Sequence, residues 1–392
     1  MDRATSRRRL ALFALFLNTG LSFASWAART PDIRDLLGAS TSEMGLVLFG
    51  LSAGSMVGIL SSGALVVRLG ARAVITGGAL AIVASMPAVG IGAATSNSFA
   101  VAAGLALLGL GMGGAEVAMN VEGADVERIV GRAVLPTLHG FFSLGTVIGG
   151  AGGIVLSAAR VPVLWHLLGM CALGLAVVLW GVRQLPADTG RRSRTTDAGV
   201  EGRPQVWRNR MVLVIGLIVF AMALAEGAAN DWLPLIMVDG YGLVPALGSA
   251  VFVAFSAAMT AGRFTGGFIL DRFGRATVLG AGAVVSGIGI ALVVTVDNAV
   301  VAGLAALLWG LGTSLGFPVA VSAAADAGDH PTAQVSLVAM VAYVAFLAGP
   351  PALGALGERY GLRTAMISVL FFVAVAGLLA PSLAVRRRVP SA

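Results

Sequence analysis

The sequence predicts an all-α membrane protein in which twelve transmembrane helices form two pseudo-symmetric six-helix bundles. Of its 392 residues, 57% are hydrophobic and only 11% are charged, whereas soluble domains carry about 25% charged residues. Twelve apolar runs are each long enough to cross a hydrocarbon core of about 30 Å. A single long polar segment divides the runs six and six, and landmarks recur between the two halves.

The first apolar run, from Leu10 to Ala28, directly follows a cluster of arginines. This start also resembles a secretory or twin-arginine signal. Because eleven further apolar runs follow, we interpret it as the first span. The other predicted spans are 44–67, 74–94, 99–121, 137–158, 163–182, 211–231, 246–269, 277–296, 299–321, 334–356 and 364–385.

The arginines predict the orientation of the chain. All 26 basic residues are arginines, and with both termini in the cytoplasm 21 of them, including Arg263 and arginines 386–388, fall on the cytoplasmic side. Five fall outside, and the positive-inside rule favours this distribution. The net charge of +7 does not indicate nucleic-acid binding, because the arginines lie in short loops and at the ends of the chain. We expect a multi-pass protein of the bacterial cytoplasmic (inner) membrane.

The polar segment predicts a domain boundary. Residues 184–210 are rich in Arg, Thr, Asp, Gly and Pro, a composition typical of a flexible linker. We therefore predict an N-terminal six-helix bundle over 1–183 and a C-terminal one over 211–392.

Two landmarks repeat between these halves. Residues 63–70, GALVVRLG, align with 267–274, GFILDRFG, at an offset of 204. Pro31 and Pro234, the predicted ends of spans one and seven, align at an offset of 203. Such duplication is typical of secondary transporters with a binding site near the membrane midplane.

The motif after span eight resembles the loop signature of the major facilitator superfamily. It runs GFILDRFGR over 267–275, and a degraded copy lies between spans two and three. The EVAMN stretch over 116–120 and Glu226 resemble the fucose-permease-like group, and SWAARTP over 25–31 with GPP over 349–351 resembles its YbjJ-type inner-membrane branch. The resemblance implies alternating access and proton coupling, with spans one, four, seven and ten lining a cavity.

Two pairs of polar residues within predicted spans are the main candidates for chemistry. Glu116 and Asn120 lie four residues apart in span four, and Glu226 and Asn230 have the same spacing in span seven. Residues four apart share one face of a helix. Because a carboxylate inside a membrane span is costly and rarely accidental, we predict proton coupling at Glu116 and Glu226 and substrate binding at both asparagines. Either Glu could instead form only an interhelical hydrogen bond.

Other polar or aromatic residues in the spans are secondary candidates for substrate binding. Trp309 and Trp26 could stack on a ring such as a sugar, and Asn18 could contact substrate or a neighbouring helix. His139 could join a proton relay or be a structural histidine. We interpret Trp232 as an anchor at the membrane interface.

The superfamily resemblance implies a gating charge lock in the loop motif. The lock would use Asp271, Arg272 and Arg275, and the candidate gating residues further include Gly267, Gly274 and Arg68. A solvated turn with anchoring arginines is the alternative. A cluster of charges after span four would form a cytoplasmic ion-pair patch that faces this lock; it comprises Glu122, Asp125, Glu127, Arg128 and Arg132.

Taken together, these features predict a secondary active transporter of a small polar, sugar-like organic solute, with proton-coupled symport. Multidrug efflux by proton antiport is the nearest alternative, although predicted span five has no Gly-Pro turn. A non-transporting sensor would need a larger soluble domain, and an enzyme would need a catalytic constellation that we do not find. The single Cys171 excludes an intrachain disulfide and a zinc cluster. We expect a monomer in the lipid bilayer that uses no cofactor and no metal.

Overall fold

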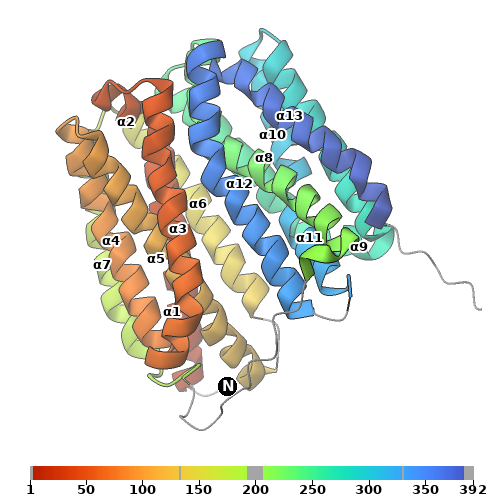
Figure 1. The fold of residues 1–392 in the computed structure, drawn as a ribbon. Coiled ribbons are helices and arrows are strands. Elements are labelled where there is room, and N and C mark those ends of the chain that lie inside the picture. The colour runs from red at the N-terminus through yellow and green to blue at the C-terminus, as the bar shows by residue number, and fades with distance from the viewer. Residues whose placement is uncertain (1–2, 132–133, 192–205, 329–330, 384–392) are drawn as a thin grey trace, which may run out of the picture. The chain divides into compact units, whose positions relative to one another are not determined.

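The computed structural model is helical almost throughout and describes residues 3–131, 134–191, 206–328 and 331–383 (Figure 1). Within these residues there are thirteen α-helices, three short 3-10 helices and no strand. Eleven helical segments of the described chain, with 299–324 counted as one, are long and apolar enough to cross a membrane. The all-α membrane fold predicted from the sequence is therefore confirmed.

The predicted spans match the long helices one by one, apart from spans eight, nine and ten. Nine helices each contain one complete or nearly complete predicted span: α1 (Arg3–Ala27), α3 (Thr41–Leu69), α4 (Ala71–Ala94), α5 (Ser98–Val130), α6 (Leu135–Ala158), α7 (Val163–Gly181), α8 (Arg210–Tyr241), α12 (Pro331–Tyr360) and α13 (Leu362–Leu379). Span ten is broken into α10 (Ala299–Thr313) and α11 (Gly316–Ala325).

Predicted spans eight and nine both lie in the 51-residue element α9 (Pro245–Thr295). The helix is interrupted at Gly274, whose φ of 75° and ψ of 165° are not helical. Only glycine adopts such a conformation without strain. The kink therefore separates two membrane crossings, and eleven helical segments provide the twelve predicted spans.

Both prolines used as repeat landmarks differ from the prediction. Pro31 does not end span one; it lies in the first turn of a separate short helix, α2 (Thr30–Leu37). Pro234 does not end span seven but lies inside α8, which continues to Tyr241. The N-terminal part of a helix tolerates proline because its first N–H groups need no intrahelical acceptor, whereas inside a membrane helix neighbouring groups compensate for the lost hydrogen bond.

By its internal contacts the chain divides into two compact units. Unit 1 comprises Met1–Ala198, Asp231–Val253 and Pro350–Leu362, and unit 2 comprises Gly199–Asn230, Ala254–Gly349 and Arg363–Ala392. Unit 1 thus includes short segments from the C-terminal part of the chain. The predicted bundles over 1–183 and 211–392 stay a prediction. Of the predicted linker, residues 192–205 lie outside the described chain, as do Arg132, His330 and arginines 386–388.

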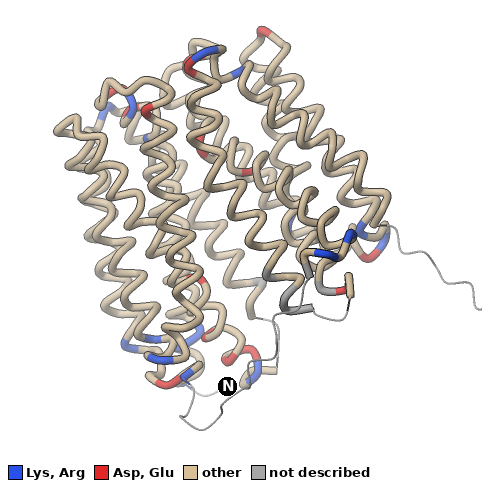
Figure 2. Tube along the Cα trace, in the orientation of Figure 1, with Lys and Arg blue, Asp and Glu red and all other residues tan. Residues whose placement is uncertain are grey.

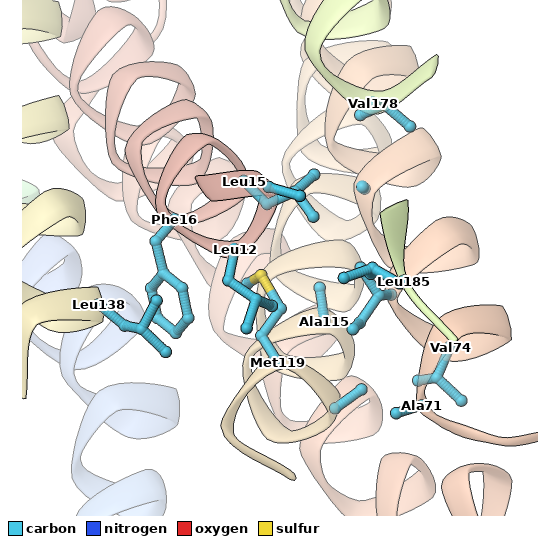
Figure 3. Close-up of a cluster of buried hydrophobic side chains, with 14 of the residues drawn as sticks. Leu12, Leu15, Phe16, Ala71, Val74, Ala115, Met119, Leu138, Val178 and Leu185 are labelled. Carbon is cyan, nitrogen blue, oxygen red and sulfur yellow. The ribbon is translucent and has the colours of Figure 1, made fainter. Parts of the chain in front are cut away.

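The core of unit 1 is formed by helices that approach very closely. A Cβ atom added at Gly54 of α3 would overlap the carbonyl oxygen of Ala106 in α5, and one at Gly109 would overlap that of Leu51. Small residues permit such contacts where no hydrophobic force drives helices together. Beside them, Leu12, Met119 and Leu185 belong to one buried apolar cluster (Figure 3). Leu185, at the start of the predicted linker, is therefore part of the core.

Charged residues collect mainly at the ends of the helices (Figure 2). One such group lies where α1 ends and α2 begins, and we call this end of unit 1 the α2 end. There Arg29 forms an ion pair with Asp32 at 2.6 Å and donates a hydrogen bond to the carbonyl of Val161. Arg34 forms an ion pair with Asp239 at the far end of α8. Ion pairs thus tie α2 to its neighbours.

Candidate functional site

In unit 1, α5 carries the first predicted polar pair. Glu116 is exposed and Asn120 is half-buried one helical turn later. The Oδ1 atom of Asn120 is buried and has no hydrogen-bond partner within the described chain. Because Gly109 and Gly113 are pressed against α3 and Gly111 against α4, the helix is held rigidly behind this pair. An amide oxygen without a partner is a group that a solute donor can satisfy.

In unit 2, α8 carries the second pair, and Glu226 has a partner. Its Oε1 accepts a hydrogen bond of 2.9 Å from Nη2 of Arg263 in α9. The Nε atom of Arg263 also lies 3.4 Å from the carbonyl oxygen of Ser314. The Glu226 side chain is 13% exposed and that of Arg263 is 39% exposed. The pair can therefore offer charged groups to a bound solute, while the guanidinium of Arg263 balances the charge of the Glu226 carboxylate.

The position of Arg263 corrects its sequence interpretation. It was counted with the arginines of the cytoplasmic loops, but it lies within α9, six residues inside the predicted span 246–269. The available signal was the same as for Glu116: an ionisable residue within an otherwise apolar run is a functional candidate. Its partner could not be identified from spacing, since 37 residues separate Arg263 from Glu226.

Trp309 of α10 is completely buried in unit 2. Its indole N–H donates to the carbonyl oxygen of Ala225 at 3.1 Å, and its ring meets that of Phe255 edge to face at 6.0 Å. Both the indole N–H and the aromatic ring of Trp309 thus contact other residues of unit 2. In this conformation Trp309 offers no ring face for a sugar, and its hydrogen bond instead fixes α10 next to Glu226 on α8.

The remaining secondary candidates lie in unit 1. Asn18 is 2% exposed and lies beside Gly174 of α7, so of its two predicted roles the structure shows a contact with a neighbouring helix. Trp26 is 1% exposed and its Nε1 has no hydrogen-bond partner among described residues. His139 is exposed on α6, with its ring 5.3 Å from that of Phe16.

The structure brings only one residue of the predicted charge lock into an ion pair. Arg275 pairs with Asp326 at 2.6 Å and donates to Ser322 Oγ at 3.0 Å. Within the described chain Asp271 forms no ion pair, and Arg272 lies over the ring of its neighbour Phe273. Of the other gating candidates, Gly274 forms the kink of α9, whereas Gly267 has open space around it and Arg68 is exposed.

The charge cluster after span four is bound to the N-terminal part of α1. Arg8 pairs with Glu122, which is completely buried, and with Asp125 at 2.7 Å. Asp125 also pairs with Arg128, whereas Glu127 accepts hydrogen bonds from two backbone N–H groups at the start of α6. Arg8, interpreted only as a topological anchor, is thus a central residue of this network.

The interpretation of Trp232 in α8 as an interface residue is wrong. Trp232, predicted to anchor the membrane interface, is completely buried in unit 1. Asp231, the last residue of the predicted span 211–231, is only 9% exposed and is followed by ten further helical residues. The interface interpretation fails because Pro234 was taken as the end of the helix.

A cavity of about 410 Å³ in unit 1 lies between α1, α6 and α7. Its lining is apolar except for Ser25 and His166. None of the predicted substrate-binding residues lines it. Among the described residues, no three His, Cys, Asp or Glu side chains are grouped so that they could hold a metal ion.

Comparisons with known proteins place this arrangement among transporters. The sequence pattern of the Major Facilitator Superfamily matches residues 11–350. An uncharacterized MFS-type transporter of Yersinia pestis is 31% identical over 91% of this chain and 90% of its own. An uncharacterized transporter of Sinorhizobium fredii is 32% identical, covering 94% and 96%.

Solved structures share the fold at lower sequence identity. A nucleoside transporter superposes with a TM-score of 0.80 at 13% identity, over 96% of this chain and 99% of its own. A D-xylose-proton symporter gives 0.77 at 13% identity, covering 96% of each chain. The Escherichia coli fucose:proton symporter gives 0.65 at 18% identity, covering 97% and 99%.

Proposed function

Because the chain belongs to the major facilitator superfamily, we propose that it is a secondary active transporter that couples a small polar, sugar-like solute to proton symport. Transport would proceed by alternating access, in which the binding site opens to one side of the membrane at a time. We further propose that it works as a monomer in a bacterial cytoplasmic membrane, with both termini cytoplasmic, as the arginine distribution favours.

The observation that carries this proposal is the Glu226–Arg263 ion pair between membrane-spanning helices. The Arg263 side chain is 39% exposed, and a charged group in a span faces a water-filled cavity or the bundle interior rather than lipid. The exposed part of the pair therefore indicates a polar path along α8 and α9. Carboxylate, guanidinium and amide groups together match the donors and acceptors of sugar hydroxyl groups.

Within this proposal the two polar helix faces have different tasks. Glu226, Arg263 and Asn230 bind solute hydroxyl groups, because the ion pair already holds the carboxylate and guanidinium in place. Glu116 carries a proton, and Asn120 beside it accepts a hydrogen bond from the solute. The known substrates of the structural neighbours, which are a nucleoside, D-xylose and fucose, support a hydroxyl-rich solute, and two of these proteins are proton symporters by name.

The first test is solute-driven proton movement into proteoliposomes loaded with a pH-sensitive dye. We expect proton influx on adding one member of a panel of sugars and nucleosides, and none with cationic drugs. Arg263→Gln should reduce the initial rate at least tenfold, because the solute loses a charge-assisted hydrogen bond worth about 1.5–3 kcal/mol. Arg160→Gln, which changes an exposed arginine in the α6–α7 turn, is the matched control and should transport normally.

Two results would contradict the assignment. Proton release from acid-loaded vesicles on adding a drug would show antiport and favour multidrug efflux. Normal uphill accumulation by Glu116→Gln would show that Glu116 does not carry the coupled proton.

A further inference from the structure

Asp231 of α8 is a buried carboxyl group that the proposed function does not use. The residue is only 9% exposed. Within residues 3–131, 134–191, 206–328 and 331–383 it forms no ion pair. In this respect it differs from Glu226, which lies five residues earlier and is paired with Arg263.

The buried residues of α8 that follow Asp231 separate it from the solution at the α2 end of unit 1. It lies eight residues before Asp239, the residue of α8 that pairs with Arg34. Eight residues of α-helix span about 12 Å. The large side chains in between are completely buried: Trp232, Leu233, Leu235, Ile236 and Met237.

An unpaired charge in such a place is unfavourable enough that the group takes up a proton instead. In water, by contrast, an aspartic acid ionises near pH 4, with a pKa of about 3.9. We propose that Asp231 is a proton-binding site that is occupied while the α2 end is closed and emptied when that end opens to water. This inference rests on the proposed alternating access, and it adds a second proton-binding group to Glu116.

Three contacts of unit 1 hold the α2 end closed around Asp231. Arg34 pairs with Asp239, the backbone N–H of Ser42 donates to Glu358 at 3.0 Å, and Ser249 donates to the carbonyl oxygen of Ala28 at 2.6 Å. Opening this end breaks contacts of α8, α9 and α12 with the α1–α3 region. The same movement admits water toward α8 and releases the Asp231 proton.

The proposal fixes the sign of the pH effect. The closed α2 end binds one more proton than the open one, so acid favours closing by about tenfold per pH unit in the range where only the closed form is protonated at Asp231. Asp239 and Glu358 act in the opposite direction, because they hold the end closed in their ionised form. A pH titration of closure therefore distinguishes Asp231 from the exposed acids.

Infrared spectroscopy tests the protonation without any solute. In the purified full-length protein at neutral pH, we expect the carbonyl stretch of a protonated carboxylic acid, and Asp231→Asn should reduce its intensity, so that any band that remains belongs to Glu116. Asp188→Asn, a change of an exposed acid of unit 1 that takes no part in closure, should leave the band in place. If Asp231→Asn leaves the carboxylic acid region unchanged while remaining folded by circular dichroism, Asp231 is ionised and the proposal is overturned.

A distance measurement tests the link to closure. Spin labels on Leu36→Cys in α2 and Val244→Cys between α8 and α9, both exposed positions, would be introduced after Cys171→Ser. We expect the short-distance population to grow as pH falls, and the growth to disappear in Asp231→Asn. The same titration in both proteins, or opening on acidification in the parent, would overturn the proposal. If acid closes the α2 end of the parent as expected but no solute moves protons into proteoliposomes, the proposed symport is wrong. The proposed proton-binding site at Asp231 would still stand.

Discussion

At the residue scale, the ion pair between Glu226 and Arg263 sets the character of unit 2. Each charge alone inside a membrane-spanning helix would be costly, and the 2.9 Å hydrogen bond between them offsets part of that cost. Because neither side chain is completely buried, their attraction is weaker than that of a dry pair. Each residue therefore depends on the other for its stability inside the span.

A double-mutant cycle measures this dependence. We expect Arg263→Gln and Glu226→Gln each to lower the free energy of unfolding in detergent, and the double variant to lose less than the sum of the two. The coupling should be about 1 kcal/mol or more, within the range for residues in contact. The midpoint of thermal unfolding provides the measurement for all four proteins. Additive losses would show that the pair contributes nothing beyond its separate residues.

The sequence shows which residues of the spans are polar. It predicts their neighbours on the same helix but not their partners on other helices. Glu116 with Asn120 is a pattern of helix periodicity, so one sequence suffices to place both on one face. The partner of Glu226 is another helix's residue, and a contact between residues 37 positions apart depends on packing. The burial of Trp309 and Trp232 depends on packing in the same way, which is why the sequence suggested a stacking platform and a membrane-interface anchor.

At the element scale, glycine contacts determine how close α3 and α5 lie. Gly54 and Gly109 bring the two helix backbones together where any Cβ atom would overlap a carbonyl oxygen. Backbone atoms cannot rotate aside as a side chain can, so the helices must separate to admit even one methyl group. The polar pair on α5 consequently relies on these glycines for its position.

We expect Gly54→Ala to destabilise the protein by about 1–3 kcal/mol, the usual range for overpacking. Gly63→Ala, on the same helix with open space around the added Cβ, is the matched control. It should be neutral or slightly stabilising, since alanine favours a helix over glycine by up to about 1 kcal/mol. Thermal unfolding in detergent compares the two. Equal midpoints for both variants would mean that α3 and α5 can separate without loss.

The sequence predicted the long helices well and their ends less well. Apolar runs identify spans reliably because the bilayer requires every backbone group to bond within the helix. Helix ends depend instead on contacts with other segments: α8 continues through Pro234, where residues 231–237 are buried within unit 1, and α2 forms where Pro31 starts a new turn. A proline alone does not distinguish these two outcomes.

At the scale of the whole molecule, the α2 end joins segments from both predicted halves of the chain. Arg34 of α2 pairs with Asp239 of α8, although 205 residues separate them. Burial alone would lower the pKa of Arg34, but hydrogen bonds and charges from Asp239 and Asp35 outweigh it and raise the pKa above its ordinary value. The guanidinium therefore stays charged at every physiological pH, and only its acidic partners can lose their charge by taking up a proton.

Removing either charge should favour opening of the α2 end. An ion pair with this exposure contributes up to about 1 kcal/mol, so Arg34→Gln or Asp239→Asn should increase the open population by up to about fivefold. Ala28→Cys, introduced after Cys171→Ser, reports opening because Ala28 is 1% exposed. A membrane-impermeant maleimide added outside whole cells should label it faster in either variant, since the proposed topology directs this end outward.

The charge swap Arg34→Asp with Asp239→Arg separates the ion pair from other effects of the two substitutions. If attraction between these side chains holds the end closed, the swapped pair restores slow labelling, and high salt speeds labelling of the parent and the swap alike. Fast labelling of the swapped protein would assign closure to Glu358 and Ser249 instead. Labelling that occurs only with reagent on the cytoplasmic side would reverse the proposed orientation, because Ala28 and the N-terminal arginines lie at opposite ends of α1.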